Sequence, residues 1–199
     1  MKKLLLTLAL IFSCSGSTSA ADATAPYYVP PAQFSVALEV MDMGFANVFA
    51  LFRTATGSFA FDETSKSISN LRLAIDTTSL LANTNENQRD LSNLLSAFQF
   101  PEIRIMAPDS VTFVDNKAEI KTTLTLHGTN KPVTFTATLN RSGKSPHGGG
   151  MWGSEGDAVG ISMQGSFKRA DFGITDSPEA PARFSDTINL RLEIQAIKQ

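Results

Sequence analysis

The sequence predicts an all-β fold, an antiparallel barrel or sandwich of eight or nine strands, accompanied by one short amphipathic helix. Three observations support this prediction: apolar residues recur with a period of two along most of the chain after Phe34, one segment has helical spacing, and polar turns separate the runs. Because closure of a sheet removes its exposed edges, a barrel is the favoured arrangement of so many strands.

Alternation defines the individual strands, since successive side chains of a strand point to opposite faces of the sheet. In the first run, Phe34, Val36, Leu38 and Val40 alternate with Ser35, Ala37 and Glu39. Equivalent alternation is found at 71–75, 120–126, 133–139, 159–163 and 188–194, with shorter candidates at 49–61, 103–106 and 111–114.

One segment, QRDLSNLLSAFQF at 88–100, breaks the period of two. Its apolar residues are spaced i, i+3, i+4 and i+7 and therefore share one face of a helix: Leu91, Leu94, Leu95 and Phe98. A single amphipathic helix among strands must bury that face against the sheet or over an open barrel end. We expect Asn87 to cap the start of this helix and Pro101 to stop it.

Turn residues separate the runs. Asp115 and Asn116 are typical of a tight hairpin, and the composition of 142–150, SGKSPHGGG, predicts a flexible loop. Residues 176–181 contain two prolines and predict a second irregular loop.

His127, one of two histidines, lies in the stretch LTLHGTNKPVTF. The favoured interpretation is a residue at a strand end, before a hairpin connection in which Gly128 and Asn130 take positive φ. A ligand or acid/base role for His127 is the alternative.

The start of the chain resembles a secretory signal peptide. Lys2 and Lys3 precede an apolar run at 4–12, and small residues follow it, so we expect cleavage after Ala20 and a mature domain at 21–199. The expected location is the periplasm. Lipoprotein anchoring through Cys14 is the minor alternative. Cleavage after Ala20 would leave no cysteine, which excludes disulfides, thiol catalysis and cysteine-bound metal in the mature chain.

Charge and motifs restrict the classes of function. Without the two N-terminal lysines, the chain has 15 basic and 19 acidic residues and is therefore mildly acidic. It also contains no run of basic residues. Both observations argue against nucleic acid or an anionic membrane surface as a partner. The sequence lacks a G-x-S-x-G elbow and the H-x-H and H-E-x-x-H spacings. We therefore predict a protein that is not an enzyme and has no metal or cofactor.

Several stretches in the same order resemble the YceI-like family of secreted polyisoprenoid-binding proteins. They are LTLHGTNKPVTF, GSFAFD at 57–62, IDTTSL at 75–80, the N-x-R-D element at 87–90, FPEIRI at 100–105, FKRADFGI at 167–174 and DTINLRLEIQA at 186–196. The resemblance covers nearly the whole mature chain. Gln33, Phe34 and Asp42 depart from it, because the family often has a histidine, a serine and a second histidine there.

The resemblance implies a lipocalin-like extended antiparallel β-barrel of about eight strands with one short amphipathic helix. Its interior would hold a long isoprenoid lipid, such as a polyprenyl phosphate or an isoprenoid quinone, for transport or storage and without stable membrane insertion. A homodimer is left open. The alternative is a packed barrel that acts in stress or surface interactions without a lipid ligand.

Fourteen phenylalanines against two tyrosines and one tryptophan suit an apolar tube, although they equally suit a dry core. The expected apolar pocket is formed by Val36, Leu38, Val40, Phe45, Phe52, Leu73, Ile75, Leu95, Phe98, Ile105, Phe135 and Met163. Asn87, Arg89 and Asp90 are candidates for head-group contacts at its mouth. Arg169 and Asp171 are expected to pair with each other or to fix the turn before Gly173.

Overall fold

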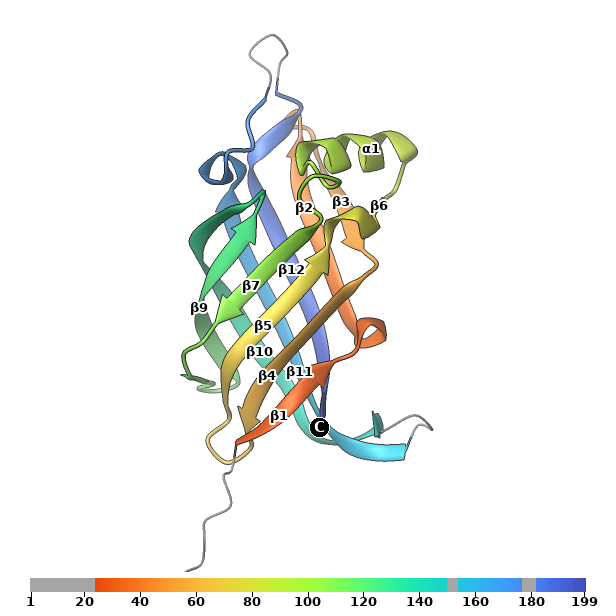
Figure 1. Cartoon of the computed structure of the whole chain (residues 1–199). Coiled ribbons are helices and arrows are strands. Elements are labelled where there is room, and N and C mark those ends of the chain that lie inside the picture. Colours follow the sequence, from red (N-terminus) through yellow and green to blue (C-terminus); the bar gives the residue numbers. More distant parts are fainter. Residues whose placement is uncertain (1–23, 150–153, 177–181) are drawn as a thin grey trace, which may run out of the picture.

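Long antiparallel strands wind around one closed barrel in the computed structural model, and an α-helix lies across one end (Figure 1). The structure describes residues 24–149, 154–176 and 182–199. The expected signal peptide and Cys14 lie outside the described residues and stay predictions.

Three of the barrel strands are each interrupted once along their length. The first consists of β1 (Thr24–Val29), the 3-10 turn η1 (Pro31–Gln33) and β2 (Phe34–Asp42). The second consists of β3 (Ala46–Phe52) and β4 (Ala55–Asp62), and the third of β5 (Ser67–Asp76), η2 (Thr77–Ser79) and β6 (Leu80–Ala82). In Figure 1 the segments β2, β3 and β6 form the upper part of this wall, and β1, β4 and β5 the lower part.

The remaining strands complete the barrel. They are β7 (Glu102–Ala107), β9 (Lys117–Leu126), β10 (Thr129–Gly149), β11 (Ser154–Lys168) and β12 (Phe184–Lys198), with the short β8 (Val111–Thr112) beside β5 and the 3-10 turn η3 (Arg169–Phe172) after β11. β12 closes the barrel by pairing with β2 in its upper part and with β1 in its lower part. The result is an eight-stranded antiparallel barrel, which confirms the predicted fold class.

The predicted alternation gives the barrel its apolar interior. In β2, Phe34, Val36, Leu38 and Val40 are buried. The residue of β3 that pairs with Val36 is Phe52, which is also buried. Fully burying such a side chain contributes about 1.5–3 kcal/mol, so the alternating runs supply most of the driving force for folding. Strand β1 was not predicted, because Pro26 and the two adjacent tyrosines interrupt the alternation of apolar and polar residues in this short segment.

Two hairpin predictions have different outcomes. Asp115 and Asn116 both have positive φ, 50° and 62°, so this prediction of a tight turn is confirmed. The next hairpin turns earlier than expected: His127 and Gly128 have φ of 52° and 71°, and Thr129 already pairs with Leu126. The expected positive φ of Asn130 was therefore wrong, because a two-residue turn closes the hairpin before it is reached.

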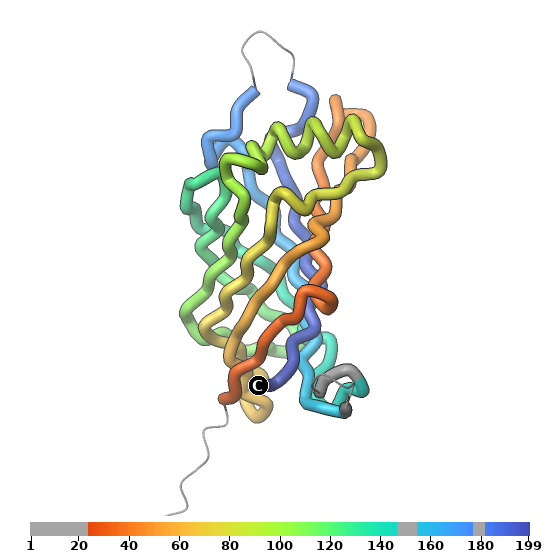
Figure 2. The backbone as a smooth tube through the Cα atoms, turned by 45° about the vertical axis from the view of Figure 1, so that its right-hand side comes forward, coloured from red at the N-terminus to blue at the C-terminus, as the bar shows by residue number. Residues whose placement is uncertain are grey.

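The segment predicted as a flexible loop after Asn140 is largely strand. Up to Gly149 it belongs to β10 and pairs with β11, for example Ser142 with Val159 and Ser145 with Gly156. Figure 2 shows this hairpin bending away to one side at the lower end of the barrel. The composition of the segment favours a loop, but a partner strand satisfies its backbone. The second expected loop, 176–181, lies outside the described residues except for Asp176.

The helix α1 (Asn85–Leu94) begins and ends earlier than expected. Thr84 caps its start by accepting a hydrogen bond from the backbone N–H of Asn87 (3.1 Å), so the expectation that Asn87 is the cap was wrong. Its end is a Schellman motif: Ala97 N–H donates to the Ser92 carbonyl, Ser96 N–H donates to Asn93, and Ser96 has a φ of 47°. The helix thus stops well before Pro101.

Candidate functional site: the barrel interior and its upper end

The upper end of the barrel is defined here by α1, the segment 95–101 that follows it, the β2–β3 turn at 43–45 and the β9–β10 turn (Figures 1 and 2). Below it lies the interior, which the sequence analysis proposed as a pocket. The polar residues that are buried among the described parts of the chain are Thr77, Thr122 and Arg169. Everything else in the core is apolar, so the interior offers contact area and almost no hydrogen-bonding groups.

Ten of the twelve residues expected to line the pocket lie in one connected core, each 3% exposed or less: Val36, Leu38, Val40, Phe52, Leu73, Ile75, Leu95, Ile105, Phe135 and Met163. Phe45 and Phe98 lie on the surface instead, with exposed fractions of 91% and 90%. Phe45 follows Gly44 in the β2–β3 turn, outside the alternation of β3. Phe98 lies beyond the helix end, so the helical spacing that grouped it with Leu95 does not hold there.

The interior is closely packed. Phe135 lies over Gly165, where an added Cβ would approach its ring to 2.7 Å, and a Cβ at Gly57 would lie 2.5 Å from Leu73. In the lower part, Tyr27 stacks on Phe59 (6.0 Å between ring centroids) and meets the edge of Phe61. Burial raises the pKa of the Tyr27 phenol. A long apolar ligand can enter this interior only if side chains or the elements at the upper end move.

Arg183, a residue that the sequence analysis did not select, joins α1 to the barrel wall. Its guanidinium donates to Asp42 at the end of β2 (3.1 Å), to Asn87 (2.6 Å) and to Asp90. The hydrogen bonds that Arg183 donates to Asp42 raise its pKa most, and the charge of Asp42 and the hydrogen bond and charge of Asp90 raise it further. Asn87 and Asp90 thus lie at the upper end, whereas their partner Arg183 is the residue just before β12.

Arg89, the third candidate for a head-group contact, lies outside this cluster. It is 67% exposed, does not contact Arg183 in the described structure, and donates from its Nε to the Asp90 carboxylate (3.2 Å). One signal in the sequence did point to the cluster: Asp42 stands where the resembling family often has a histidine. Nothing local to Arg183 distinguishes it from other surface arginines.

Thr77 and His127 hold the segment 95–101 in place. The buried Thr77 hydroxyl lies 2.7 Å from the Phe100 carbonyl and 3.2 Å from that of Ala97. The His127 ring packs against Phe100 (4.2 Å between centroids), and its Nε2 lies 3.3 Å from the Ser96 hydroxyl. His127 thus lies at the end of β9, where the favoured interpretation placed it, and its contacts join the β9–β10 turn to the segment after α1.

Arg169 is buried and organises the connection from β11 to β12. It donates to the carbonyls of Ile174 (3.0 Å) and Phe184 (3.1 Å) and pairs with Asp176. It therefore fixes the turn, as one of the two expectations stated. The other expectation, a pair with Asp171, was wrong, because the short turn η3 directs Arg169 inward toward Asp176.

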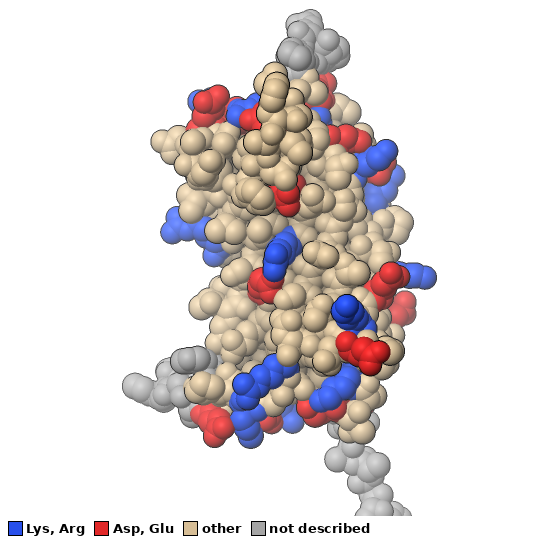
Figure 3. Space-filling model, turned by 180° about the vertical axis from the view of Figure 1, so that it is seen from behind, with Lys and Arg blue, Asp and Glu red and all other residues tan. Residues whose placement is uncertain are grey.

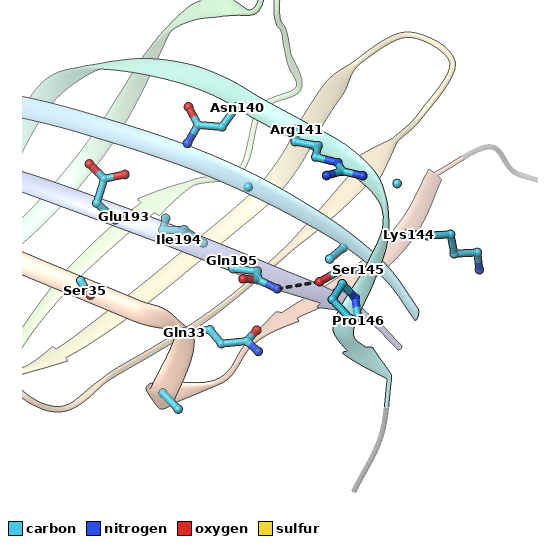
Figure 4. Close-up of a pocket in the computed structure, with 14 residues that line it drawn as sticks. Gln33, Ser35, Asn140, Arg141, Lys144, Ser145, Pro146, Glu193, Ile194 and Gln195 are labelled. Atoms are coloured by element: carbon cyan, nitrogen blue, oxygen red, sulfur yellow. Dashed lines mark hydrogen bonds between the residues drawn. The ribbon is translucent and has the colours of Figure 1, made fainter. Parts of the chain in front are cut away.

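A groove of about 560 Å³ lies outside the barrel wall, between η1 and the curved part of β10 (Figure 4). Gln33 and Gln195 face Ser145 and Pro146 across it, and Gln195 Nε2 donates to the Ser145 hydroxyl (3.2 Å). Its polar walls differ from the apolar interior, so the two are separate features.

Charges on the outside are interspersed, with Lys and Arg beside Asp and Glu on the face shown in Figure 3. In the described ranges, no group of three or more His, Cys, Asp or Glu side chains is arranged to hold a metal ion. The described part of the chain also contains no helix with the length and apolar character needed to cross a bilayer.

Comparison with known proteins supports the fold. A model of the YceI-like domain matches residues 27–196. UPF0312 proteins of Pseudomonas putida strain F1 and Pseudomonas fluorescens strain SBW25 are 27% and 26% identical over 163 residues, which cover 81% of this chain and 79% of each relative.

Among solved structures, BcnA of Burkholderia cenocepacia superposes with a TM-score of 0.68 at 15% identity, covering 84% of this chain and 98% of BcnA. The YCEI protein of Campylobacter jejuni reaches 0.63 at 22% identity, covering 80% and 93%. A domain from Saccharophagus degradans, described as polyisoprenoid-binding and implicated in plant cell wall breakdown, reaches 0.59 at 13% identity, covering 88% and 99%.

Proposed function

Because the chain belongs to the YceI-like domain family, we propose that it binds a long-chain isoprenoid lipid inside its barrel, without catalysis, for transport or storage in the periplasm. The observation that carries the proposal is the interior itself: an eight-stranded barrel whose inward side chains are apolar along its length. The polyisoprenoid-binding description of the Saccharophagus degradans domain, which shares this fold, supports it.

Apolar burial alone gives enough free energy for such binding. Each buried CH₂ contributes roughly 0.8 kcal/mol, so one five-carbon isoprene unit supplies about 3–4 kcal/mol before costs. Association and ordering cost several kcal/mol, which the first units offset. A chain of several units therefore binds without a hydrogen bond, and specificity would come from the length of the chain and the shape of the upper end.

Entry is proposed at the upper end. The lower part of the interior is filled by the ring of Tyr27, which stacks on Phe59 and meets Phe61 edge to face, and all three residues belong to the barrel wall itself. At the upper end, α1 and its following segment are held by the Arg183 cluster and by Thr77, and these contacts can break without opening the sheet. Since the interior is packed, binding must be coupled to movement of this cover and of core side chains.

The test is to purify the protein from its native compartment, extract it with organic solvent and identify lipid by mass spectrometry. The delipidated protein is then offered a polyprenyl phosphate and an isoprenoid quinone in detergent. A matched pair of variants locates the ligand. Ala137→Leu adds bulk to the interior, because Ala137 is 2% exposed, and Thr138→Leu adds the same side chain to the outer face of the same strand.

We expect Ala137→Leu to lower the amount of bound lipid several-fold while Thr138→Leu leaves it unchanged. A native extract free of lipid, together with no uptake of either added lipid, would contradict the proposal. That result would favour the alternative of a packed barrel acting in surface interactions, for which the tight packing around Phe135 is the supporting observation.

A further inference from the structure

The two most exposed phenylalanines of the described chain lie on separate connections at the upper end of the barrel. Phe45 is in the β2–β3 turn and is 91% exposed, and Phe98 is in the segment between α1 and β7 and is 90% exposed. Met43, beside Phe45, is 61% exposed. The backbone N–H of Met43 bonds to the Arg183 carbonyl (2.7 Å), and Arg183 in turn holds α1, so the two connections belong to one surface.

The apolar surface continues down one side of the upper wall. Phe49 and Leu51 lie on the outer face of β3, with exposed fractions of 58% and 52%, and Leu51 pairs with Leu81 of β6, which is 45% exposed. Single exposed apolar residues are ordinary, but a group of them at one end of a molecule indicates an interaction surface.

The charged side chains around α1 neutralise one another. Arg183 bonds to Asp42 and Asp90 and lies 3.7 Å from Glu86, and Arg89 bonds to Asp90. Three acidic and two basic side chains leave about one negative charge, already engaged in ion pairs. This cluster therefore supplies no positive charge that would attract an anionic membrane, and it presents little charge that would have to be dehydrated at a neutral one.

The shape of the surface favours a fluid partner. A stable protein interface needs a packed apolar centre whose anchors fill pockets on the partner. Phe45 and Phe98 are instead isolated rings at the tips of two connections, separated by polar groups of α1. A lipid interface accepts such rings without complementary pockets, and phenylalanine is found on the apolar face of helices that bury this face at the boundary between head groups and acyl chains.

We infer that the upper end docks on the surface of a bilayer of zwitterionic lipids, with Phe45 and Phe98 inserted among the head groups. The inference rests on the proposed function, since it places the entry for a lipid chain at the bilayer from which that chain is taken. Contact is peripheral and reversible, and it is driven by apolar insertion.

Flotation with phosphatidylcholine vesicles tests the inference. We compare the wild-type chain with the double variant F45S/F98S and with Val114→Ser. Val114 is 70% exposed in the β8–β9 connection at the opposite, lower end, so it is a matched loss of an exposed apolar side chain. The wild type and Val114→Ser should float with the vesicles, and F45S/F98S should partition on the order of tenfold less. Raising NaCl from about 0.1 to about 1 M should not weaken binding, because screening acts on charges alone.

Three results would overturn the inference: F45S/F98S floating as well as the wild type, wild-type binding only to vesicles that contain phosphatidylglycerol and only at low salt, or no wild-type flotation at all. Sedimentation analysis tests whether a second copy of the chain, and not a bilayer, binds to this surface. A wild-type dimer that F45S/F98S converts to monomers would assign the surface to a second copy of the chain and overturn the inference too.

Loading from detergent separates this inference from the proposed function. F45S/F98S should take up a polyprenyl phosphate from detergent as the wild type does, because both rings lie outside the core. Normal vesicle binding by a wild-type protein that takes up no lipid would contradict the proposed function alone. Normal uptake by a wild-type protein that binds no vesicle would contradict the docking surface alone.

Discussion

The hydroxyl of Thr77 donates a hydrogen bond of 2.7 Å to the main-chain carbonyl of Phe100, across the top of the barrel. The bond joins the turn between β5 and β6 to the segment that leaves α1. The backbone N–H of Thr77 also donates to the Pro101 carbonyl (3.0 Å), so one buried residue holds the cover of the interior at two points.

Thr77→Val keeps the shape of the side chain but removes its donor. We expect unfolding free energy to fall by about 1–3 kcal/mol, because the carbonyls of Ala97 and Phe100 lose a buried partner. Urea unfolding measures the change. Thr78→Val is the control, since its hydroxyl bonds to Asp76 at an exposed position and its loss should cost under about 0.5 kcal/mol. Equal costs for the two variants would show that the bond to Phe100 is unimportant.

Arg183→Met should loosen α1. The substitution leaves Asp42 and Asp90 close together without their common cation, and we expect a cost of about 2 kcal/mol. Hydrogen exchange of the α1 amides should accelerate, while exchange in β9 and β10 stays slow. Arg89→Met provides the comparison: its side chain is 67% exposed, so it should change the stability by less than about 0.5 kcal/mol. Unchanged exchange in α1 of Arg183→Met would contradict the assigned role.

His127→Gln tests whether the histidine is structural. The variant loses the ring contact with Phe100 and places glutamine at a φ of 52°, for which we expect a cost of at most about 1 kcal/mol. Lipid content, measured by extraction, should equal that of the wild type. Loss of lipid from a folded variant would instead assign His127 to the binding site.

The contribution of Asp62 in the β4–β5 turn to the stability of the folded chain should depend on pH. Backbone N–H groups of Ser65 (3.1 Å) and Thr64 (2.8 Å) donate to its carboxylate and hold its pKa below the ordinary value of 3.8. Because the pKa of Asp62 is lower in the folded chain than in the unfolded chain, its ionised carboxylate stabilises the folded chain at pH values above the ordinary pKa. This stabilisation is lost as the pH falls through the pKa of the folded state. Asp62→Asn should therefore lower the midpoint of urea unfolding at pH 7 and change it little near pH 2. Equal differences at both pH values would refute this account.

Much of the barrel follows from local patterns in the sequence. The period of two in runs such as 34–40 and 188–194 identifies strands, because it reflects the geometry of a single strand. Asp115 and Asn116 define their hairpin in the same way, since few residues tolerate positive φ at both positions. Of the expected pocket residues, those within alternating strands are buried.

Errors occurred where a local pattern ends. Phe98 continues the helical spacing of Leu91 and Leu95, yet the Schellman motif at Ser96 turns the chain before Phe98 is reached. The glycine-rich composition of the segment that starts at Ser142 indicates a loop, but pairing with β11 makes the segment a strand. The Ser142 hydroxyl also donates to the carboxylate of Glu63 in the β4–β5 turn (2.7 Å). Neither outcome can be derived from the segment considered alone.

By itself, the sequence determined the strands, their parity and the presence of one helix, because these depend on residues a few positions apart. The tertiary structure decided which groups meet at the upper end. Arg183 bonds to Asp42 and Asp90 at separations of 141 and 93 residues, and no local spacing encodes such pairs. It also decided that Phe45 and Phe98 are both exposed at the upper end, because the closed barrel brings two distant connections to one rim.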